Sequence, residues 1–239
     1  MLFGRRSIDV VSLAESYLDA GDPAGWFEPV YAAARGKADR VPWVHGSGSA
    51  HPYVRGWLDD PVVSPPGSRA VVVGAGLGDD AALLAERGYE VVAFDISETA
   101  IAWARRRHGT PVDWRVANLV DLPDDFGTFD LVVEVATVAY LPGVVRDAAM
   151  HAIGTLARPD AVAVTIGPLK TSADVTEPWD GPPWPQVPSE LAAYRSGGLE
   201  RVAFEHADPD EDGMLEFRAT WQRTANGQDA QPGGRLPLF

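Results

Sequence analysis

The residues with the clearest chemical signal are three glycines at alternate positions, Gly74, Gly76 and Gly78. An apolar, β-branched run at 71–73 precedes them, and two acids, Asp79 and Asp80, follow directly. With the helical pattern of 81–87, this order is typical of a buried strand, a tight loop and a helix N-terminus. Backbone N–H groups and the positive helix end would face a ligand there, and glycine is needed because a Cβ would block close approach.

The spacing of the glycines indicates which ligand the loop holds. A dinucleotide fingerprint needs a third glycine three residues after the second, and that position is Asp79. Neighbouring carboxylates suit a cationic or amine-bearing ligand better than a pyrophosphate. The next strand-like run, 90–95, ends in Asp95, about twenty residues past the first glycine, where an acid can hold a ribose diol.

These residues resemble motifs of the class I S-adenosylmethionine (SAM)-dependent methyltransferases. The loop from Gly74 to Asp80 looks like their first motif, and Phe94-Asp95-Ile96-Ser97 looks like their second. The resemblance implies that SAM is the cofactor. It also implies a set of cofactor-binding residues that follow successive strands or precede the first one: Trp43, Gly74, Ala75, Gly76, Gly78, Asp80, Asp95, Ile96, Ser97, Asn118, Leu119 and Glu134.

Other motifs resemble the thiopurine-methyltransferase-like branch, which includes thiol and halide methyltransferases. The shared features are Pro42-Trp43, Asp80, Glu134 and a Leu-Pro-x-x-x-Arg-like segment at 141–146. The resemblance extends from about Trp26 to Arg223. One departure is the segment 158–161, Arg-Pro-Asp-Ala, where the family usually has Pro-Gly-Gly. We expect this turn to lie at the far end of the sheet, where it affects turn geometry and not cofactor binding.

Composition and charge narrow the class of protein further. Hydrophobic residues make up 46% of the chain and charged residues 23%, as in ordinary globular proteins. The net charge of −14 leaves no basic footprint for nucleic acid, and the basic run 105–108 is placed to close a helix. The chain has no cysteine, which removes disulfides and thiolate metal sites, and we expect no metal. With no signal peptide and no membrane-length apolar run, we expect a cytoplasmic enzyme, monomer or homodimer.

The order of the patterns predicts an α/β fold with a doubly wound, mostly parallel, seven-stranded Rossmann-like sheet. Strand-like runs alternate with helix-length patterns, and the expected strands are 71–73, 90–95, 112–116, 129–134 and 161–166. Runs at 199–206 and 214–223 predict an antiparallel C-terminal hairpin. Ligands should therefore bind at the carboxyl ends of the strands, near the first and the fourth.

Three regions divide the chain. Residues 1–68 form an N-terminal helical arm, with one helix expected over 7–20 and a second starting at Asp22-Pro23. A Gly/Ser loop within this arm, between aromatic residues, could be a lid. Residues 69–224 form the SAM-binding core, including a helix at 189–196, and residues 225–239 are expected to be disordered.

Methyl transfer is an in-line displacement at an activated sulfonium, so the protein contributes mainly by positioning the two reactants. A general base is optional for a thiolate, a halide or a free amine and useful for a hydroxyl. His45 and His51 in the loop could act as bases, although a lone loop histidine is more often solvated; no residue is assigned as catalytic. Trp26, Tyr140 and Trp184 are the candidate acceptor-binding residues, with Trp179 beside them, and core packing is the alternative for these aromatics.

The expected substrate is a small, largely apolar acceptor: a thiol, a heteroaromatic or a phenol. We expect no methylation of nucleic acid or protein. A non-catalytic SAM-binding protein remains an alternative, because its cofactor motifs would be the same. A nicotinamide-dependent oxidoreductase is a weaker alternative, because Asp79 opposes it and no catalytic Tyr-x-x-x-Lys is present.

Overall fold

The computed structural model describes residues 9–44, 49–59, 67–109, 111–170, 181–208 and 214–224. A seven-stranded sheet of order β3-β2-β1-β4-β5-β7-β6 forms its centre, and β7 alone runs antiparallel to its neighbours. The strands are β1 (Arg69–Val73), β2 (Glu90–Asp95), β3 (Val112–Val116), β4 (Phe129–Val135), β5 (Ala157–Lys170), β6 (Leu199–His206) and β7 (Met214–Arg223). The predicted Rossmann-like sheet and its antiparallel C-terminal hairpin are confirmed.

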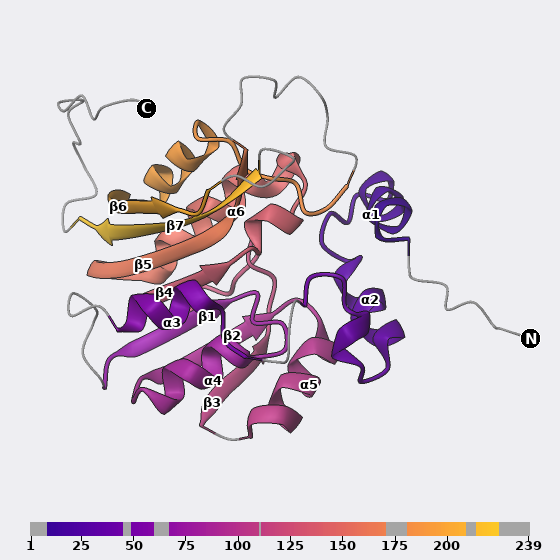
Figure 1. The fold of residues 1–239 in the computed structure, drawn as a ribbon, viewed down its shortest axis with the longest axis horizontal. Coiled ribbons are helices and arrows are strands. Elements are labelled where there is room, and N and C mark those ends of the chain that lie inside the picture. Colours follow the sequence, from indigo (N-terminus) through magenta and orange to yellow (C-terminus); the bar gives the residue numbers. More distant parts are fainter. Residues whose placement is uncertain are drawn as a thin grey trace, which may run out of the picture.

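Helices cover both faces of this sheet. The α-helices are α1 (Val10–Asp19), α2 (Phe27–Ala34), α3 (Pro52–Leu58), α4 (Asp79–Glu86), α5 (Glu98–His108) and α6 (Gly143–Leu156). Three 3-10 helices are η1 (Ala38–Arg40), η2 (Val138–Tyr140) and η3 (Glu190–Gly197). Figure 1 shows α1 and α2 beyond one end of the sheet, whereas α4 and α5 run beside the strands.

Alternate residues of β1 enter two separate cores. Val71 packs in the core that contains Met150 of α6, and Val72 packs in the core that contains Leu84 of α4 and Trp57 of α3. The last four residues of β1 are buried, which explains why this strand reads as a continuous apolar run. The central strands are therefore held from both sides, and their carboxyl ends are fixed relative to one another.

Local signals place the helices that begin at those carboxyl ends. Ser97 caps α5, because its Oγ accepts a hydrogen bond from the backbone N–H of Ala100 at 3.0 Å. The basic run at 105–108 forms the last turn of α5, as predicted. Helix α4 begins directly after Gly78, which caps it in the left-handed region at φ +86°.

The predicted helix start at Asp22-Pro23 is wrong. The segment 23–26 forms turns, and α2 begins only at Phe27. The physical reason is local: Oδ1 of Asp22 accepts a hydrogen bond from the N–H of Gly25 at 2.9 Å, which closes a turn instead of capping a helix. The first helix begins at Val10 with Asp9 as its cap, slightly inside the predicted range.

Two boundaries in the C-terminal half also differ from the prediction. The helix expected over 189–196 is the 3-10 helix η3, and β5 begins at Ala157, before the expected start. Asp160 has φ +65°, a left-handed conformation at a position where the resembling family usually has glycine. The pairing of β5 with β4 shifts register between Phe129 and Leu131 of β4. Residues 158–161 belong to the amino-terminal part of β5 instead of a turn, and they lie outside the wall of the main cavity. That this departure leaves cofactor binding unaffected remains a prediction.

Hydrogen bonds join helix α3 of the N-terminal arm to strand β7. Trp57 Nε1 of α3 donates to Thr220 Oγ1 at 3.2 Å, and Arg218 Nη1 of β7 donates to the carbonyl of Tyr53 at 3.0 Å.

The division of the chain at residue 68 remains a prediction. His45, Trp179 and the tail 225–239 lie outside the described residues. Among the described helices, none is long and apolar enough to span a membrane.

Candidate cofactor and acceptor site

A cavity of about 1130 Å³ opens at the carboxyl ends of the central strands. Its wall includes the glycine loop, the ends of β2 and β3, the segment after β4, and parts of the N-terminal arm. Pockets for one small ligand usually have about 300–1,000 Å³. The cavity therefore has room for a cofactor and a second small molecule.

Close packing explains why the loop after β1 needs glycine. Gly74 has φ +61°, and a Cβ there would overlap the side chain of Thr137, which donates a hydrogen bond to the carbonyl of Val73 at 3.1 Å. A Cβ on Gly78 would lie 2.5 Å from the Trp114 ring. The backbone of the loop can thus lie directly against the cavity.

Asp95 lies at the carboxyl end of β2 with a carboxylate that is almost fully buried. Its Oδ2 accepts a hydrogen bond from the N–H of Gly76 at 2.9 Å, and its Oδ1 accepts one from the N–H of Ser97 at 2.9 Å. Burial raises the pKa of Asp95, while these two backbone donors oppose that rise. Each oxygen keeps a lone pair, so the carboxylate is oriented to accept hydrogen bonds from a diol.

The two acids after the glycine loop have different surroundings. Asp79 binds Arg107 at 2.9 Å and lies 3.4 Å from Nε2 of His108, so its charge is compensated within the chain. Asp80 Oδ1 accepts a hydrogen bond from the N–H of His51 at 2.7 Å, and burial raises its pKa. In contrast to Asp79, Asp80 forms no ion pair with an arginine among the described residues.

Two of the predicted cofactor residues do not line the cavity. Ser97 is fully buried, and its hydroxyl donates to Oε2 of Glu28 at 2.6 Å, which ties α2 to α5. Glu134 is buried at the end of β4, where Oε1 accepts from the N–H of Val138 at 3.0 Å. Tyr194 donates to Oε2 at 3.4 Å, and burial raises the pKa of Glu134 to about 7. The Ser97 hydroxyl and the Glu134 carboxyl therefore support segments that line the cavity, without lining it themselves.

The remaining predicted cofactor residues do line the cavity. From the glycine loop and the strand ends, these are Trp43, Gly74, Ala75, Gly76, Gly78, Asp80, Asp95, Ile96, Asn118 and Leu119. A local hydrogen bond holds the side chain of Asn118, because its Oδ1 accepts from the backbone N–H of Val120 at 3.2 Å. The structure brings these residues to the same cavity, and their contacts with a cofactor remain a prediction.

An aromatic wall faces the glycine loop. Trp43 Nε1 donates to the hydroxyl of Tyr31 at 2.9 Å, and the Trp43 and Tyr140 rings lie 5.2 Å apart. Phe27 completes the wall. Burial raises the pKa of Tyr140 to about 12, so its hydroxyl stays protonated at neutral pH and can donate. Sequence reasoning missed Tyr31 and Phe27 as site residues, although their place on the apolar face of α2 was visible.

Two predicted acceptor residues lie behind this wall. Trp26 is fully buried and stacks on Phe27 with a centroid distance of 4.1 Å. Trp184 packs against the same cluster, and the cavity wall includes its neighbour Pro183. Among the described residues, the Nε1 of Trp26 has no hydrogen-bond partner. Both tryptophans therefore back the wall and do not form it.

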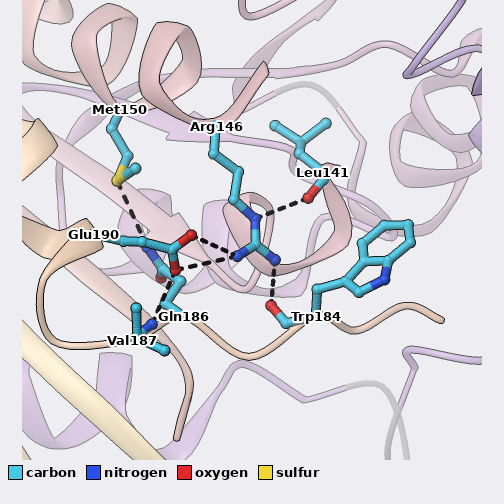
Figure 2. A network of polar contacts seen from close by, with 7 residues as sticks. All are labelled: Leu141, Arg146, Met150, Trp184, Gln186, Val187 and Glu190. Atoms are coloured by element: carbon cyan, nitrogen blue, oxygen red, sulfur yellow. Dashed lines mark hydrogen bonds and ion pairs between the residues drawn. The ribbon is translucent and has the colours of Figure 1, made fainter. Parts of the chain in front are cut away.

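A buried arginine fixes the acceptor side of the cavity (Figure 2). Arg146 Nε donates to the carbonyl of Leu141 at 2.9 Å, and Nη2 donates to the carbonyl of Trp184. Nη1 lies 3.3 Å from both carboxylate oxygens of Glu190. The N–H of Trp184 also donates to the carbonyl of Ala139 at 2.7 Å. The arginine of the predicted Leu-Pro-x-x-x-Arg-like segment thus joins the segment after β4 to the segment after β5.

A histidine and a glutamate from distant parts of the chain meet at the cavity. His51 Nε2 lies 3.0 Å from Oε1 of Glu216, and both residues belong to the wall. The other ring nitrogen, Nδ1, accepts a hydrogen bond from the N–H of Tyr53 at 3.2 Å. Because both ring nitrogens are engaged, His51 has no free lone pair for the base function considered from the sequence.

Residues 70–160 match the family model described as a methyltransferase domain. Among curated protein sequences, none matches this chain. A structure solved for the conversion of a disulfide bond into a thioacetal group during echinomycin biosynthesis is similar, with 21% identity and a TM-score of 0.64. The match covers 83% of this chain and 92% of that one.

Two further solved structures are similar. The [4+2]-cyclase SpnF has a TM-score of 0.67 at 14% identity, with 91% of this chain and 97% of that chain covered. Geranyl diphosphate C-methyltransferase from Streptomyces coelicolor A3(2), solved with S-adenosyl-L-homocysteine, has a TM-score of 0.61 at 15% identity, with 72% and 77% covered.

At these identities, the likeness to solved structures shows the fold. The match to a methyltransferase domain supports SAM as the cofactor. Three of the similar structures were solved with sinefungin or S-adenosyl-L-homocysteine. These findings do not confirm the thiopurine-methyltransferase-like branch. Residues 70–160 thus match a methyltransferase domain, and the chain has the Rossmann-like methyltransferase fold of these solved structures.

Proposed function

We propose that this protein transfers a methyl group from SAM to a small, largely apolar acceptor: a thiol, a heteroaromatic or a phenol. One observation carries the proposal: a single cavity joins the glycine loop and the oriented Asp95 to the aromatic wall of Trp43 and Tyr140. A relationship to the thiopurine-methyltransferase-like branch is part of the same proposal.

The cofactor half of the cavity suits a nucleoside that carries a positive charge. SAM, when bound, supplies an activated methyl group on a sulfonium. Asp95 would accept the ribose hydroxyls, and the backbone of the loop at 74–78 would lie against the amino-acid portion. Ile96 and Leu119 would pack on the base, with Asn118 beside it. Ser97 and Glu134 would act indirectly, by supporting segments that touch the cofactor.

The acceptor half suits a flat or aliphatic molecule. Phe27, Trp43 and Tyr140 offer apolar surfaces, and the protonated Tyr140 hydroxyl can orient a polar atom of the acceptor. Trp26 and Trp184 keep this wall rigid from behind. Rigid placement of the acceptor is the main contribution that a protein can make to this reaction. The acidic chain and the aromatic cavity wall favour a small molecule over nucleic acid or protein, and we place the enzyme in the cytoplasm as a monomer or homodimer.

A SAM-binding protein that does not transfer methyl groups is the second candidate. One observation favours it: the similar structure of SpnF is that of a [4+2]-cyclase, so this fold also serves other chemistry. Turnover separates the two candidates, because a non-methylating protein would bind SAM without converting it.

The experiment is an acceptor panel with SAM as the methyl donor, in which formation of S-adenosylhomocysteine and of methylated product is measured. The panel contains small thiols, heteroaromatics and phenols, together with DNA, RNA and a protein mixture. We expect methylation of at least one small acceptor and of none of the macromolecules. Methylation of macromolecules alone, or no turnover in protein that binds SAM, would overturn the proposal.

A further inference from the structure

The surroundings of His51 determine which of its nitrogens carries the proton. Nδ1 faces the backbone N–H of Tyr53 at 3.2 Å, and a backbone N–H can only donate. Nδ1 therefore holds the lone pair, and the proton of the neutral ring lies on Nε2. Nε2 then donates to Oε1 of Glu216 at 3.0 Å. His51 is a hydrogen-bond donor to this carboxylate.

This contact orients the carboxylate of Glu216 at the cavity. Within the part of the chain that the structure describes, Oε1 is the one carboxylate oxygen of Glu216 with a hydrogen bond. The side chain is 48% exposed, so a proton on its other oxygen can reach water. Glu216 pairs in register with Pro168 of β5, which also lines the cavity.

His51 links this carboxylate to the cofactor half. Its backbone N–H donates to Oδ1 of Asp80 at 2.7 Å, at the first turn of the helix that follows the glycine loop. One residue thus contacts both Asp80 and Glu216, and all three residues belong to the wall of the same cavity.

We propose that Glu216 takes the proton from the acceptor, and that His51 is the positioning residue that orients it. The inference rests on the proposed function. The acceptor's X–H bond breaks and its proton passes to Oε2 of Glu216, while the freed electron pair of X forms the bond to the methyl carbon. The electrons of the broken carbon–sulfur bond stay on sulfur, and the proton leaves Glu216 for water. A phenol or a neutral thiol needs such a base, whereas an acceptor that is already ionised does not.

Attachment of α3 to β7 does not account for the pair by itself. The bonds from Trp57 to Thr220 and from Arg218 to Tyr53 already hold α3 on β7 and do not involve Glu216. The charged and titratable groups around the pair come from four elements: Asp80 of α4, Tyr53 and Arg55 of α3, Arg218 of β7 and Glu205 of β6. Asp208 is a further acid in the cavity wall.

The test compares Glu216→Gln with wild-type protein on two acceptors: a phenol of ordinary pKa and an aryl thiol that is ionised at the assay pH. We expect kcat for the phenol to fall at least about 100-fold, the lower end of the usual contribution of a general base, with recovery as rising pH ionises the phenol. Turnover of the thiolate should change less than about threefold. The control is Glu200→Gln on β6, an acid paired with Arg195 outside the cavity wall, which should behave as wild type.

Equal losses for both acceptors, or no loss, would overturn the assignment while leaving the methyltransferase proposal intact. No turnover of any acceptor by wild-type protein would overturn both. A second readout needs no turnover: ¹⁵N NMR of the histidine rings, with His51 assigned through His51→Gln. We expect the Nε2-protonated tautomer at neutral pH, and an Nδ1-protonated ring would contradict the proposal.

Discussion

The cofactor half and the acceptor half of the cavity are built in different ways. The cofactor half consists mainly of backbone and of residues at or just after the carboxyl ends of β1, β2 and β3, such as Gly76, Asp95 and Asn118. The acceptor half is assembled from segments far apart in sequence, such as Trp43 of the N-terminal arm and Tyr140 after β4.

This difference shows where local sequence patterns are informative. Asp95 is oriented by N–H groups of Gly76 and Ser97, so a short motif contains the whole arrangement. Arg146 reaches Trp184 across 38 residues and Glu190 across 44. Contacts at such separations depend on the complete fold. Substitutions in the two halves should therefore have separable effects on cofactor affinity, acceptor use and stability.

The largest expected effect comes from breaking the acceptor half at Arg146. Arg146→Met leaves Glu190 and two backbone carbonyls without their partner, so we expect the free energy of unfolding to fall by about 3–5 kcal/mol. Denaturant titrations of the wild-type and variant proteins measure this free energy of unfolding. Arg195→Met, which removes an exposed ion pair with Glu200, should cost at most about 1 kcal/mol. Equal effects of the two substitutions would show that the buried network contributes little.

The next effect is a pH dependence at Glu134, which is buried near the end of β4 outside the cavity wall. Burial raises its pKa from 4.5 to about 7, so the folded state binds more protons than the unfolded state between these values. The free energy of unfolding of wild-type protein should fall by about 3 kcal/mol, relative to Glu134→Gln, as pH rises from about 4.5 to 7. Denaturant titrations at several pH values measure the difference. Parallel pH profiles for the two proteins would contradict the buried, protonated carboxyl.

Asp95→Ala tests the cofactor half. If the carboxylate accepts the ribose hydroxyls, SAM affinity should weaken by about 1.5–3 kcal/mol while the fold survives. Calorimetry measures the affinity, and Asp124→Ala, an exposed acid between β3 and β4, serves as a control with unchanged binding. A folded Asp95→Ala protein with wild-type affinity would mean that Asp95 only holds the backbone of Gly76 and Ser97.

The smallest expected effect concerns Trp184. Because its ring lies behind the aromatic wall, Trp184→Ala should loosen the acceptor half and raise the acceptor KM by about tenfold, or 1.4 kcal/mol, with SAM affinity nearly unchanged. Steady-state kinetics and calorimetry measure the two quantities. Equal loss of SAM affinity would place this segment over the cofactor instead.

The sequence was sufficient to predict the fold and most of the cofactor wall, because strand ends and glycine spacing are local signals. It did not reveal that Trp26 lies behind Phe27, since a helical pattern does not say which aromatic faces a cavity. It also did not pair His51 with Glu216, 165 residues apart. The helix start at Asp22 was wrong, because a capping residue and a turn residue use the same side-chain oxygen.

The most direct test of the account is calorimetric titration of the wild-type protein with SAM and, separately, with NAD. The account predicts saturable SAM binding at one site per chain and no binding of NAD, because Asp79 replaces the third glycine and Asp80 faces the cavity beside it. Binding of NAD without any response to SAM would contradict the step from fold to function.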